Sequence, residues 1–493
     1  MARTKQAVII GGGLAGLSAA CYMARAGYRT IILEKNSAVG GKSQFTEDQG
    51  FKFSLGPSWY IMPDVYEDFF NDFGQNPEDH YSLTRLSPAY RSFVSGSKTD
   101  ALEIDRMAEQ LDTIHPGDGL GFKRLVNRSK ILYSEFKLNV MNQDWKGKSD
   151  LLKPRVLSLL LSLPRGTASE RTTKLLSSKD SQAMINSTSM LFGVPARTLP
   201  APYSFLPYTI FEQGVWYPGG GFSSVILAFK DLAQKLGVEI YEGYQVESIE
   251  VEYGVASAVI IKDIGQRIPA DVIISASGYP TTESIIPPDK RSYTPKFWQS
   301  KLYSPSSITV SLGLDVKVPN LLHHNTFSDI DPTTDVGPDS RAWPLRLGSF
   351  QVSCPSLTDH SLAPGEGEVL SINIPIPSGL QESEDIRDSL VSQAFARIST
   401  AAGFNIEEHI VTKHVISSSY FKNMFDSPGG STHGIALTKK QIFYRRPRIR
   451  SKKLENFFFA GQDTNPGPGM PFAITSGKLA AYAALGKKPE AKL

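Results

Sequence analysis

Glycines near the N-terminus have the spacing of a loop that binds dinucleotide phosphates. They form the motif Gly11-x-Gly13-x-x-Gly16 between an apolar run at residues 7–10 and an Ala- and Leu-rich stretch at residues 14–26. In a strand, turn and helix of this kind, the first glycine allows the tight turn and the second lets the backbone approach a pyrophosphate. The third lets helix and strand pack closely. Because the helix N-terminus can receive the phosphates, the motif predicts a dinucleotide-binding site.

An acidic residue stands where such a site would hold a ribose. A β-branched run at residues 30–33 predicts the second strand of the unit, and this strand ends at Glu34. A carboxylate at that point accepts hydrogen bonds from the ribose hydroxyls. We assign Leu14 and Ala15, at the start of the helix, and Lys35, beside the acid, to the same site.

A second strand and helix near the C-terminus could also stabilise negative charge. An apolar run at residues 457–460 leads through a Gly- and Pro-rich stretch into a helix expected at residues 473–485. Such a helix start presents unpaired N–H groups and the positive end of the helix dipole. The candidate residues in this stretch are Gly461, Asp463, Met470 and Pro471.

Length and composition limit the elements that can position these residues. The chain has 493 residues, enough for two or three domains, and its apolar fraction of 41% is that of a folded soluble protein. A net charge of +3 argues against nucleic-acid binding. The only two cysteines exclude a disulfide framework and favour a reducing compartment, and no Cys/His spacing predicts a metal site. Glycines within residues 7–24 argue against a signal peptide or membrane span there.

The residues after the first unit narrow the choice of cofactor. Val39-Gly40-Gly41-Lys42-Ser43 resembles the glycine pair and base that follow the dinucleotide unit in the flavin amine oxidase superfamily. In that superfamily the segment lies near the FAD diphosphate and ribityl chain, so the resemblance implies FAD as cofactor and places Gly41 and Lys42 in its site. Lys42 stands where arginine is commoner; it keeps the positive charge without the planar fork.

Residues 50–63, GFKFSLGPSWYIMP, make the resemblance more specific. They look like the corresponding segment of the bacterial and fungal type of phytoene desaturase, a carotenoid desaturase family of the same superfamily. There the segment lines the flavin and the substrate entrance, so the resemblance implies that Gly56, Pro57 and Ser58 belong to the site. Ser54 and Ser58 replace an expected Asp and Thr.

The middle of the chain contains a further part of the same pattern. GVWYPGGG at residues 214–221 precedes a predicted helix, with Ser223 as its N-terminal cap and Gly237 just past its end. The strands predicted next lie at residues 238–241, 246–251 and 271–275. This order matches the phytoene desaturase family, and the resemblance implies that Val246 contacts the adenine through its backbone.

The closing segment also resembles that family, in its FxGxxTxPGxGxPxxxxSGxxAA pattern. The resemblance implies that the last helix starts at the flavin pyrimidine edge and that Asp463 holds the ribityl or phosphate end.

The positions of the motifs imply interleaved domains. We predict an α/β fold with mixed α+β character, in which a Rossmann-like FAD-binding domain is interleaved with a substrate-binding domain and a helical membrane-associated region. The FAD-binding domain comprises residues 1–75, 214–279 and 442–493, and the substrate-binding domain residues 76–213 and 280–441. In the latter, His323 and His324 are expected to form a loop pair.

Two basic regions are candidates for membrane contact. Residues 151–164, LLKPRVLSLLLSLP, lie within a cation-rich part of the chain at about residues 145–180. Such a helix either docks on an anionic membrane surface or is buried with snorkelling lysines, and the sequence favours neither. The basic run at residues 445–453 would contact headgroups or form a solvated loop, which is slightly favoured.

The resemblance implies dehydrogenation of a long apolar polyene by hydride transfer to flavin, in carotenoid biosynthesis. The substrate would be phytoene-like with C40 or diapophytoene-like with C30. No second GxGxxG follows a strand, so oxygen or a quinone is expected to reoxidise the flavin. By resemblance Asp150 is a candidate acid or base, and a surface pair with Lys153 is the alternative. The expected location is cytoplasmic, peripherally associated with the membrane.

Two other functions stay open. A flavin amine oxidase of the same fold would need an aromatic cage facing the flavin, and residues 461–475 contain no Tyr or Trp. A non-enzymatic prenyl carrier resembling the Rab GDP dissociation inhibitors would share the architecture without using flavin. The intact glycine motif and Glu34 argue against such a carrier.

Overall fold

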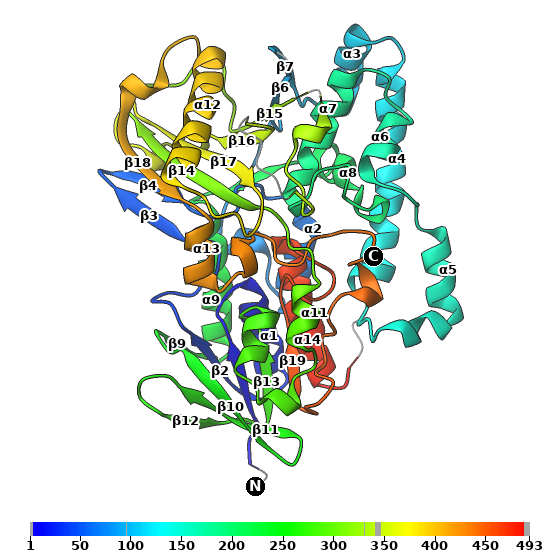
Figure 1. Ribbon diagram of the computed structural model, residues 1–493, viewed down its shortest axis with the longest axis vertical. Helices are drawn as coiled ribbons and strands as arrows, with labels where there is room; N and C mark the ends of the chain where they lie inside the picture. Colours follow the sequence, from blue (N-terminus) through cyan, green and yellow to red (C-terminus); the bar gives the residue numbers. More distant parts are fainter. Residues whose placement is uncertain (1–2, 95, 330, 341–346, 488–493) are drawn as a thin grey trace.

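The computed structural model describes residues 3–94, 96–329, 331–340 and 347–487. In the view of Figure 1, the lower part holds a parallel sheet and the upper part a larger, mainly antiparallel sheet. A group of helices from residues 104–211 lies along one side of both.

The parallel sheet is built from segments far apart in the sequence. Its strand order is β19-β13-β1-β2-β9, and all pairings are parallel. The strands are β1 (Gln6–Ile10), β2 (Arg29–Glu34), β9 (Glu239–Glu242), β13 (Val272–Ser275) and β19 (Phe457–Phe459). They come from the first, middle and last of the segments predicted to bind the dinucleotide.

Both faces of this sheet are covered, as the continuous apolar runs of its strands require. Ala7 and Ile9 face three helices, whereas Val8 and Ile10 face a three-stranded sheet, because successive side chains of a strand point to opposite sides. The helices are α1 (Leu14–Arg25), α9 (Phe222–Lys235) and α14 (Met470–Ala484), and the small sheet comprises β10 (Val246–Glu252), β11 (Val255–Ile261) and β12 (Arg267–Pro269).

The larger sheet has seven strands in the order β18-β14-β17-β16-β15-β6-β7. They are β6 (Arg91–Val94), β7 (Ser97–Asp100), β14 (Ser306–Leu314), β15 (His324–Ser328), β16 (Phe350–Ser353), β17 (Glu368–Ile376) and β18 (Ile410–Ile416). Its outer face packs on α12 (Glu384–Ala402) through aliphatic side chains such as Val310 and Ile372. The hairpin of β3 (Phe45–Asp48) and β4 (Phe51–Ser54) joins this sheet at one edge, where Asp48 accepts hydrogen bonds from Thr412 and His414.

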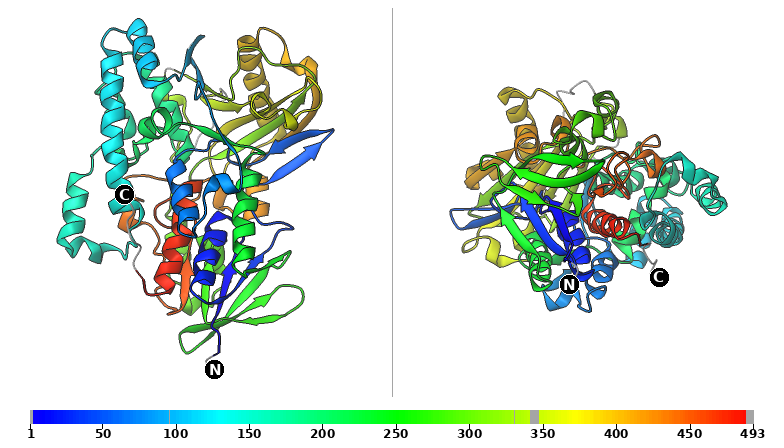
Figure 2. Two further views of the ribbon diagram at one scale, coloured as in Figure 1. Left: turned by 180° about the vertical axis from the view of Figure 1, so that it is seen from behind. Right: turned by 90° about the horizontal axis from the view of Figure 1, so that it is seen from below.

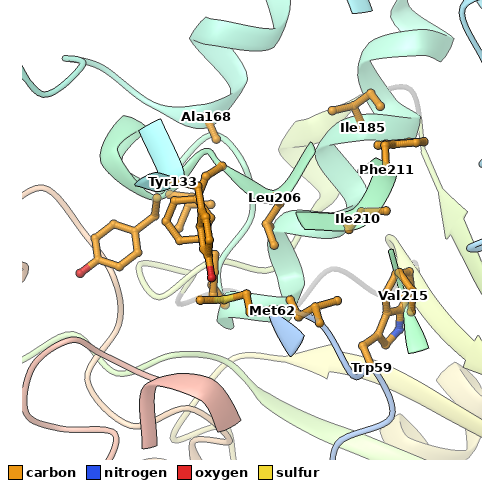
Figure 3. Packing of buried hydrophobic residues seen from close by; sticks show 14 of the residues in the cluster. Trp59, Met62, Tyr133, Ala168, Ile185, Leu206, Ile210, Phe211 and Val215 are labelled. Carbon is orange, nitrogen blue, oxygen red and sulfur yellow. The ribbon is translucent and has the colours of Figure 1, made fainter. Parts of the chain in front are cut away.

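The helices and residues 59–62 share the largest apolar core. Figure 3 shows side chains from these segments, among them Trp59, Met62, Tyr133 and Phe211, pointing toward one another. The helices of this part are α3 (Ile104–Ile114), α4 (Asp118–Phe136), α5 (Pro154–Ser162), α6 (Ala168–Thr173), α7 (Lys179–Ser187) and α8 (Leu206–Phe211). The remaining elements are α2 (Pro63–Asn71), α10 (Tyr279–Ser284), α11 (Pro295–Gln299), α13 (Ser418–Phe425), β5 (Leu83–Arg85) and β8 (Trp216–Pro218).

Three expected local features differ from the structure. The last helix begins at Met470, because Pro471 fits the first turn of a helix. Ser223 does not cap α9; Gly221 holds the cap position, and the Ser223 hydroxyl donates to the Gly220 carbonyl at 2.7 Å. His324 is not in a loop but starts β15, and its side chain is fully buried.

The apolar stretch 151–164 also begins its helix later than expected. Residues 148–152 form a short 3-10 turn, and α5 starts only at Pro154. Within the described part of the chain, no helix combines the length and apolarity needed to cross a bilayer.

Candidate functional site

A cavity of about 620 Å³ lies where the two large sheets and the helices meet. Of the residues predicted to bind the cofactor, all but Gly16 line it. Those residues are Gly11, Gly13, Leu14, Ala15, Glu34, Lys35, Gly41, Lys42, Gly56, Pro57, Ser58, Val246, Gly461, Asp463, Met470 and Pro471. The structure thus brings together around one cavity residues that the sequence spreads over 460 positions.

The glycine loop leaves room for a ligand on the cavity side. Gly11 has φ +97°, which favours glycine, and a Cβ on Gly16 would lie 1.9 Å from the Gly11 carbonyl oxygen. A Cβ on Gly13 would instead meet only Gly41 Cα, at 3.8 Å, and would extend into the cavity. No side chain caps the start of α1, so the N–H groups of its first turn remain available to an anion. This cradle fits a dinucleotide pyrophosphate.

Glu34 orders this loop as well as facing the cavity. Its carboxylate is buried and accepts hydrogen bonds from the Gly12 N–H at 2.7 Å and the Asn36 N–H at 2.9 Å. Because a carboxylate offers about four lone-pair sites, two backbone bonds leave capacity for a ribose hydroxyl. Contact with a ribose stays a prediction.

Lys42 places a positive charge in the cavity wall. Its ammonium donates to the Thr432 carbonyl at 2.6 Å, the Gln462 side-chain oxygen at 3.2 Å and the Ser431 carbonyl at 3.3 Å. Burial among these groups lowers the pKa of Lys42 to about 8, although nearby Asp463 acts in the opposite direction. The lysine therefore connects the first cofactor segment to the last and attracts anionic ligands.

Two other predicted residues already have protein partners. Lys35 forms an ion pair with Asp426 at 2.6 Å, and both residues line the cavity. Asp463 is buried, and its two oxygens accept from the Ile435 N–H at 3.0 Å and the Tyr279 N–H at 3.2 Å. Asp463 thus holds together three chain segments around the cavity, and its contact with a ribityl chain stays a prediction.

Asp150 does not take part in the site. Its carboxylate is buried in a local turn, where it pairs with the Lys153 ammonium at 2.5 Å and accepts from the Lys146 N–H at 2.5 Å. It is not among the residues that line the cavity. The structure therefore gives no support to a role of Asp150 as acid or base. It favours the predicted alternative, an ion pair with Lys153.

The basic run at 445–453 contains a structural arginine that sequence reasoning missed. Arg446 is buried, and its guanidinium donates to the carbonyls of Thr464, Ile435, Gln441 and Gln462. Five donors in a planar fork match such a cluster of carbonyls. The run is therefore not simply a solvated loop, because Arg446 ties the segment at residues 435–441 to the segment at residues 462–464.

The cavity continues beyond the predicted cofactor residues. One wall is apolar, with Trp59, Met190, Leu191, Phe192 and Phe472. Other lining residues come from the seven-stranded sheet, among them Thr309 and Gln351, and His433 lines the cavity next to Gly193. Met190, Leu191 and Phe192 lie in a segment without a recognised motif, and only the three-dimensional arrangement reveals them, whereas Trp59 and Phe472 lie within recognised segments.

The fold and the site fit one class of protein: a dinucleotide-binding oxidoreductase with a single cavity lined by both large sheets and by helices. Residues 14–485 match the model of the family described as flavin containing amine oxidoreductase, and the chain belongs to this family. The predicted superfamily membership, the mixed α/β fold and FAD as the cofactor are confirmed.

The curated relatives match along nearly the whole chain. A carotenoid 3,4-desaturase of Haloarcula japonica is 32% identical over 485 residues, covering 96% of this chain and 97% of that protein. A zeta-carotene-forming phytoene desaturase of Myxococcus xanthus is 27% identical over 492 residues, covering 96% and 93%. A solved structure of putrescine oxidase bound to putrescine has a TM-score of 0.63 and 13% identity, covering 98% and 100%. The last similarity shows the fold alone.

Proposed function

We propose that this protein is an FAD-dependent carotenoid desaturase that dehydrogenates an acyclic polyene, phytoene-like with C40 or diapophytoene-like with C30. One observation carries the proposal. A single cavity joins the glycine cradle to an apolar wall, in a chain whose full-length relatives bear the names of carotenoid desaturases.

FAD, when bound, supplies the acceptor for a hydride that leaves an allylic CH2 group. The residues of this chain provide the surroundings. The apolar wall of Trp59, Leu191 and Phe192 holds the polyene and excludes water. The start of α14 presents the positive end of the helix dipole and the N–H groups of residues such as Met470 and Phe472, while Pro471 has no N–H to donate. Lys42 adds a cation, so both features favour negative charge in the cavity.

We propose that the segment around α5 binds the membrane surface from which the polyene enters. Leu152, in the turn before α5, is 85% exposed, and Leu157 and Leu161, within α5, are 47% and 62% exposed. Exposed cations flank them, including Lys148 and Arg165. Figures 1 and 2 place α5 at the outer edge of the molecule. Apolar and cationic groups together favour an anionic bilayer surface.

The electron acceptor in this proposal is oxygen or a quinone, and the location is cytoplasmic at the membrane surface. Purified protein loaded with FAD would be incubated with acyclic carotenes in liposomes, and the products separated by HPLC. The proposal predicts products with a longer chromophore. Absence of any product from every acyclic carotene, together with peroxide release from polyamines, would establish the amine oxidase alternative instead.

A further inference from the structure

One histidine lies where the predicted cofactor residues meet the apolar wall of the cavity. His433 lines the cavity, and its ring packs against Gly193, the residue after Phe192 of that wall. A Cβ on Gly193 would lie 2.5 Å from His433 Cγ and 2.7 Å from His433 Nδ1, so a glycine is needed to admit the ring. The residue before the histidine, Thr432, accepts a hydrogen bond from the Lys42 ammonium through its carbonyl, at 2.6 Å. His433 is therefore adjacent both to the cofactor residues and to the apolar wall.

The Thr432 side chain determines which ring nitrogen of His433 carries the proton. The Thr432 hydroxyl donates its one hydrogen to the Pro305 carbonyl at 3.0 Å. The hydroxyl oxygen can then only accept from His433 Nδ1, which lies 2.8 Å away. In a neutral imidazole one nitrogen donates and the other accepts, so the hydrogen-bond network assigns the proton to Nδ1 and a lone pair to Nε2.

The Nε2 atom of His433 is accessible from the cavity. It has no hydrogen-bond partner among the described residues, and unlike His324 Nε2 it is not fully enclosed by other atoms. The backbone N–H of His433 donates to the Ser304 hydroxyl at 2.9 Å, so the residue is held at two points. Burial, together with the positive charge of Lys42, lowers the pKa of His433 to about 4. The imidazole is therefore neutral at pH 7, and its lone pair is available to a proton.

The carboxylates that line the cavity in the described part of the chain already have partners. They are Glu34 and Asp463, each of whose oxygens accepts from a backbone N–H, and Asp426, which is exposed and pairs with a lysine. Of the described groups on the cavity wall, His433 alone offers an interior basic atom without a partner.

We infer that His433 is a catalytic residue of the desaturation, whose Nε2 atom takes the proton from the polyene. The inference rests on the proposed function. Loss of a hydride from an allylic carbon leaves a positive charge, and a C–H bond on the neighbouring carbon then breaks. Its electron pair becomes the second bond of the new C=C, and its proton forms an imidazolium at Nε2. The hydride goes to the flavin with its electron pair, so the polyene loses two hydrogens and two electrons.

A weakly basic imidazole is sufficient for this step. A C–H bond beside a carbocation is far more acidic than an imidazolium, so the transfer to Nε2 is downhill. The low pKa of His433 then allows the imidazolium to release its proton before the next turnover. One proton is consumed when oxygen or a quinone accepts the electrons of the reduced flavin, so protons balance over the whole cycle.

The first test is His433→Asn. The amide nitrogen of asparagine takes the place of Nδ1 and keeps a donor for Thr432, but nothing replaces Nε2. FAD-loaded full-length protein in liposomes is given an acyclic polyene at saturating concentration. We expect kcat for double-bond formation to fall about 100-fold or more. The KM for the polyene, and the Kd for FAD from flavin fluorescence, should stay within about 3-fold of the wild type. His115→Asn, at an exposed histidine, is the matched control and should change none of the three values.

The second test uses the wild-type protein. Diethyl pyrocarbonate acylates neutral imidazoles at an accessible lone pair, and peptide mass spectrometry reports each histidine separately. His433 of the FAD-loaded protein should be acylated, and a saturated hydrocarbon of the same chain length should protect it. His324, whose side chain is 0% exposed, should stay unmodified. Turnover should fall in step with acylation of His433, and hydroxylamine, which removes the acyl group, should restore it.

The outcomes separate this inference from the proposed function. A kcat of His433→Asn within about 3-fold of the wild type, an unreactive His433, or full turnover after its acylation would overturn the inference alone. A loss of activity matched by an equal loss of FAD affinity would also overturn it, because His433 would then hold the cofactor. If His433→Asn does not fold, the acylation of the wild type decides. Failure of the wild-type protein to convert any acyclic polyene would overturn the proposed function.

Discussion

Replacing Gly13 by alanine should abolish strong FAD binding without harming the fold. Gly13 has φ −72° and ψ 176°, a conformation open to any L-residue. The only atom within 4 Å of an added Cβ would be Gly41 Cα, at 3.8 Å, which is ordinary van der Waals contact. The methyl group therefore strains nothing in the protein, yet it occupies the side of the loop from which the pyrophosphate approaches.

The expected effects of Gly13→Ala on stability and on FAD binding differ in sign and size. Alanine in a compatible backbone conformation is expected to raise the free energy of unfolding by about 0.4–1 kcal/mol. A hydrogen bond from an N–H group to a charged phosphate contributes about 1.5–3 kcal/mol. Loss of one or two such bonds weakens FAD binding by about 2–5 kcal/mol, or about 30- to 4,000-fold in Kd.

The assay needs two measurements on the apoprotein: a flavin fluorescence titration and thermal unfolding. Gly16→Ala is the matched comparison, because its Cβ would lie 1.9 Å from the Gly11 carbonyl oxygen and should lower the melting temperature. If Gly13→Ala binds FAD within about 3-fold of the wild type, or unfolds as early as Gly16→Ala, the assignment of the cradle is wrong.

Three further substitutions test the site and its surroundings. Arg446→Met leaves four buried carbonyls without their shared donor and should lower the free energy of unfolding by about 3–5 kcal/mol in urea titrations. The control is Arg445→Met, at the exposed neighbour, which should change the free energy of unfolding by less than about 0.5 kcal/mol. Burial lowers the pKa of Lys42 to about 8 in the folded protein. Between about pH 8 and about pH 10, the unfolded apoprotein therefore binds more protons than the folded one, and the free energy of unfolding rises with pH. Lys42→Met should reduce this rise when urea titrations at about pH 8 and about pH 10 are compared, and an unchanged slope would contradict the burial of the ammonium. Leu161→Glu should weaken co-sedimentation with anionic liposomes about 10-fold or more. The control is Ile264→Glu, at a residue that is equally exposed but far along the chain, and it should leave co-sedimentation unchanged. Equal effects of the two substitutions would contradict membrane binding by α5.

The nucleotide half of the fold was predictable because its signals are local. The glycine motif, the strand ending at Glu34 and the GG-Lys segment each depend on residues within a few positions of one another, and residues of all three line the cavity. The predicted start of α14 was three residues too late, because Pro471 was taken as part of the preceding loop although it lies in the first turn of the helix.

Features that depend on tertiary contacts were not predictable to the same degree. Arg446 looked like one cation in a basic run, and only tertiary contacts reveal that four carbonyls from separate segments converge on it. The register of the seven-stranded sheet, such as the pairing of Asn373 with Thr309 and Gln351, cannot be deduced from the separate sequences of its strands. Asp150 was chosen by position in the resemblance, and the local turn gives its carboxylate a different partner.

Anaerobic single turnover tests the central claim most directly. FAD-loaded protein is mixed with an acyclic polyene in liposomes while the visible absorption of the flavin and the products are followed together. The account predicts that the flavin bleaches as double bonds form, in equal amounts, and that oxygen or a quinone restores the colour. Formation of new double bonds without bleaching, or bleaching by polyamines with the polyene unchanged, would contradict it.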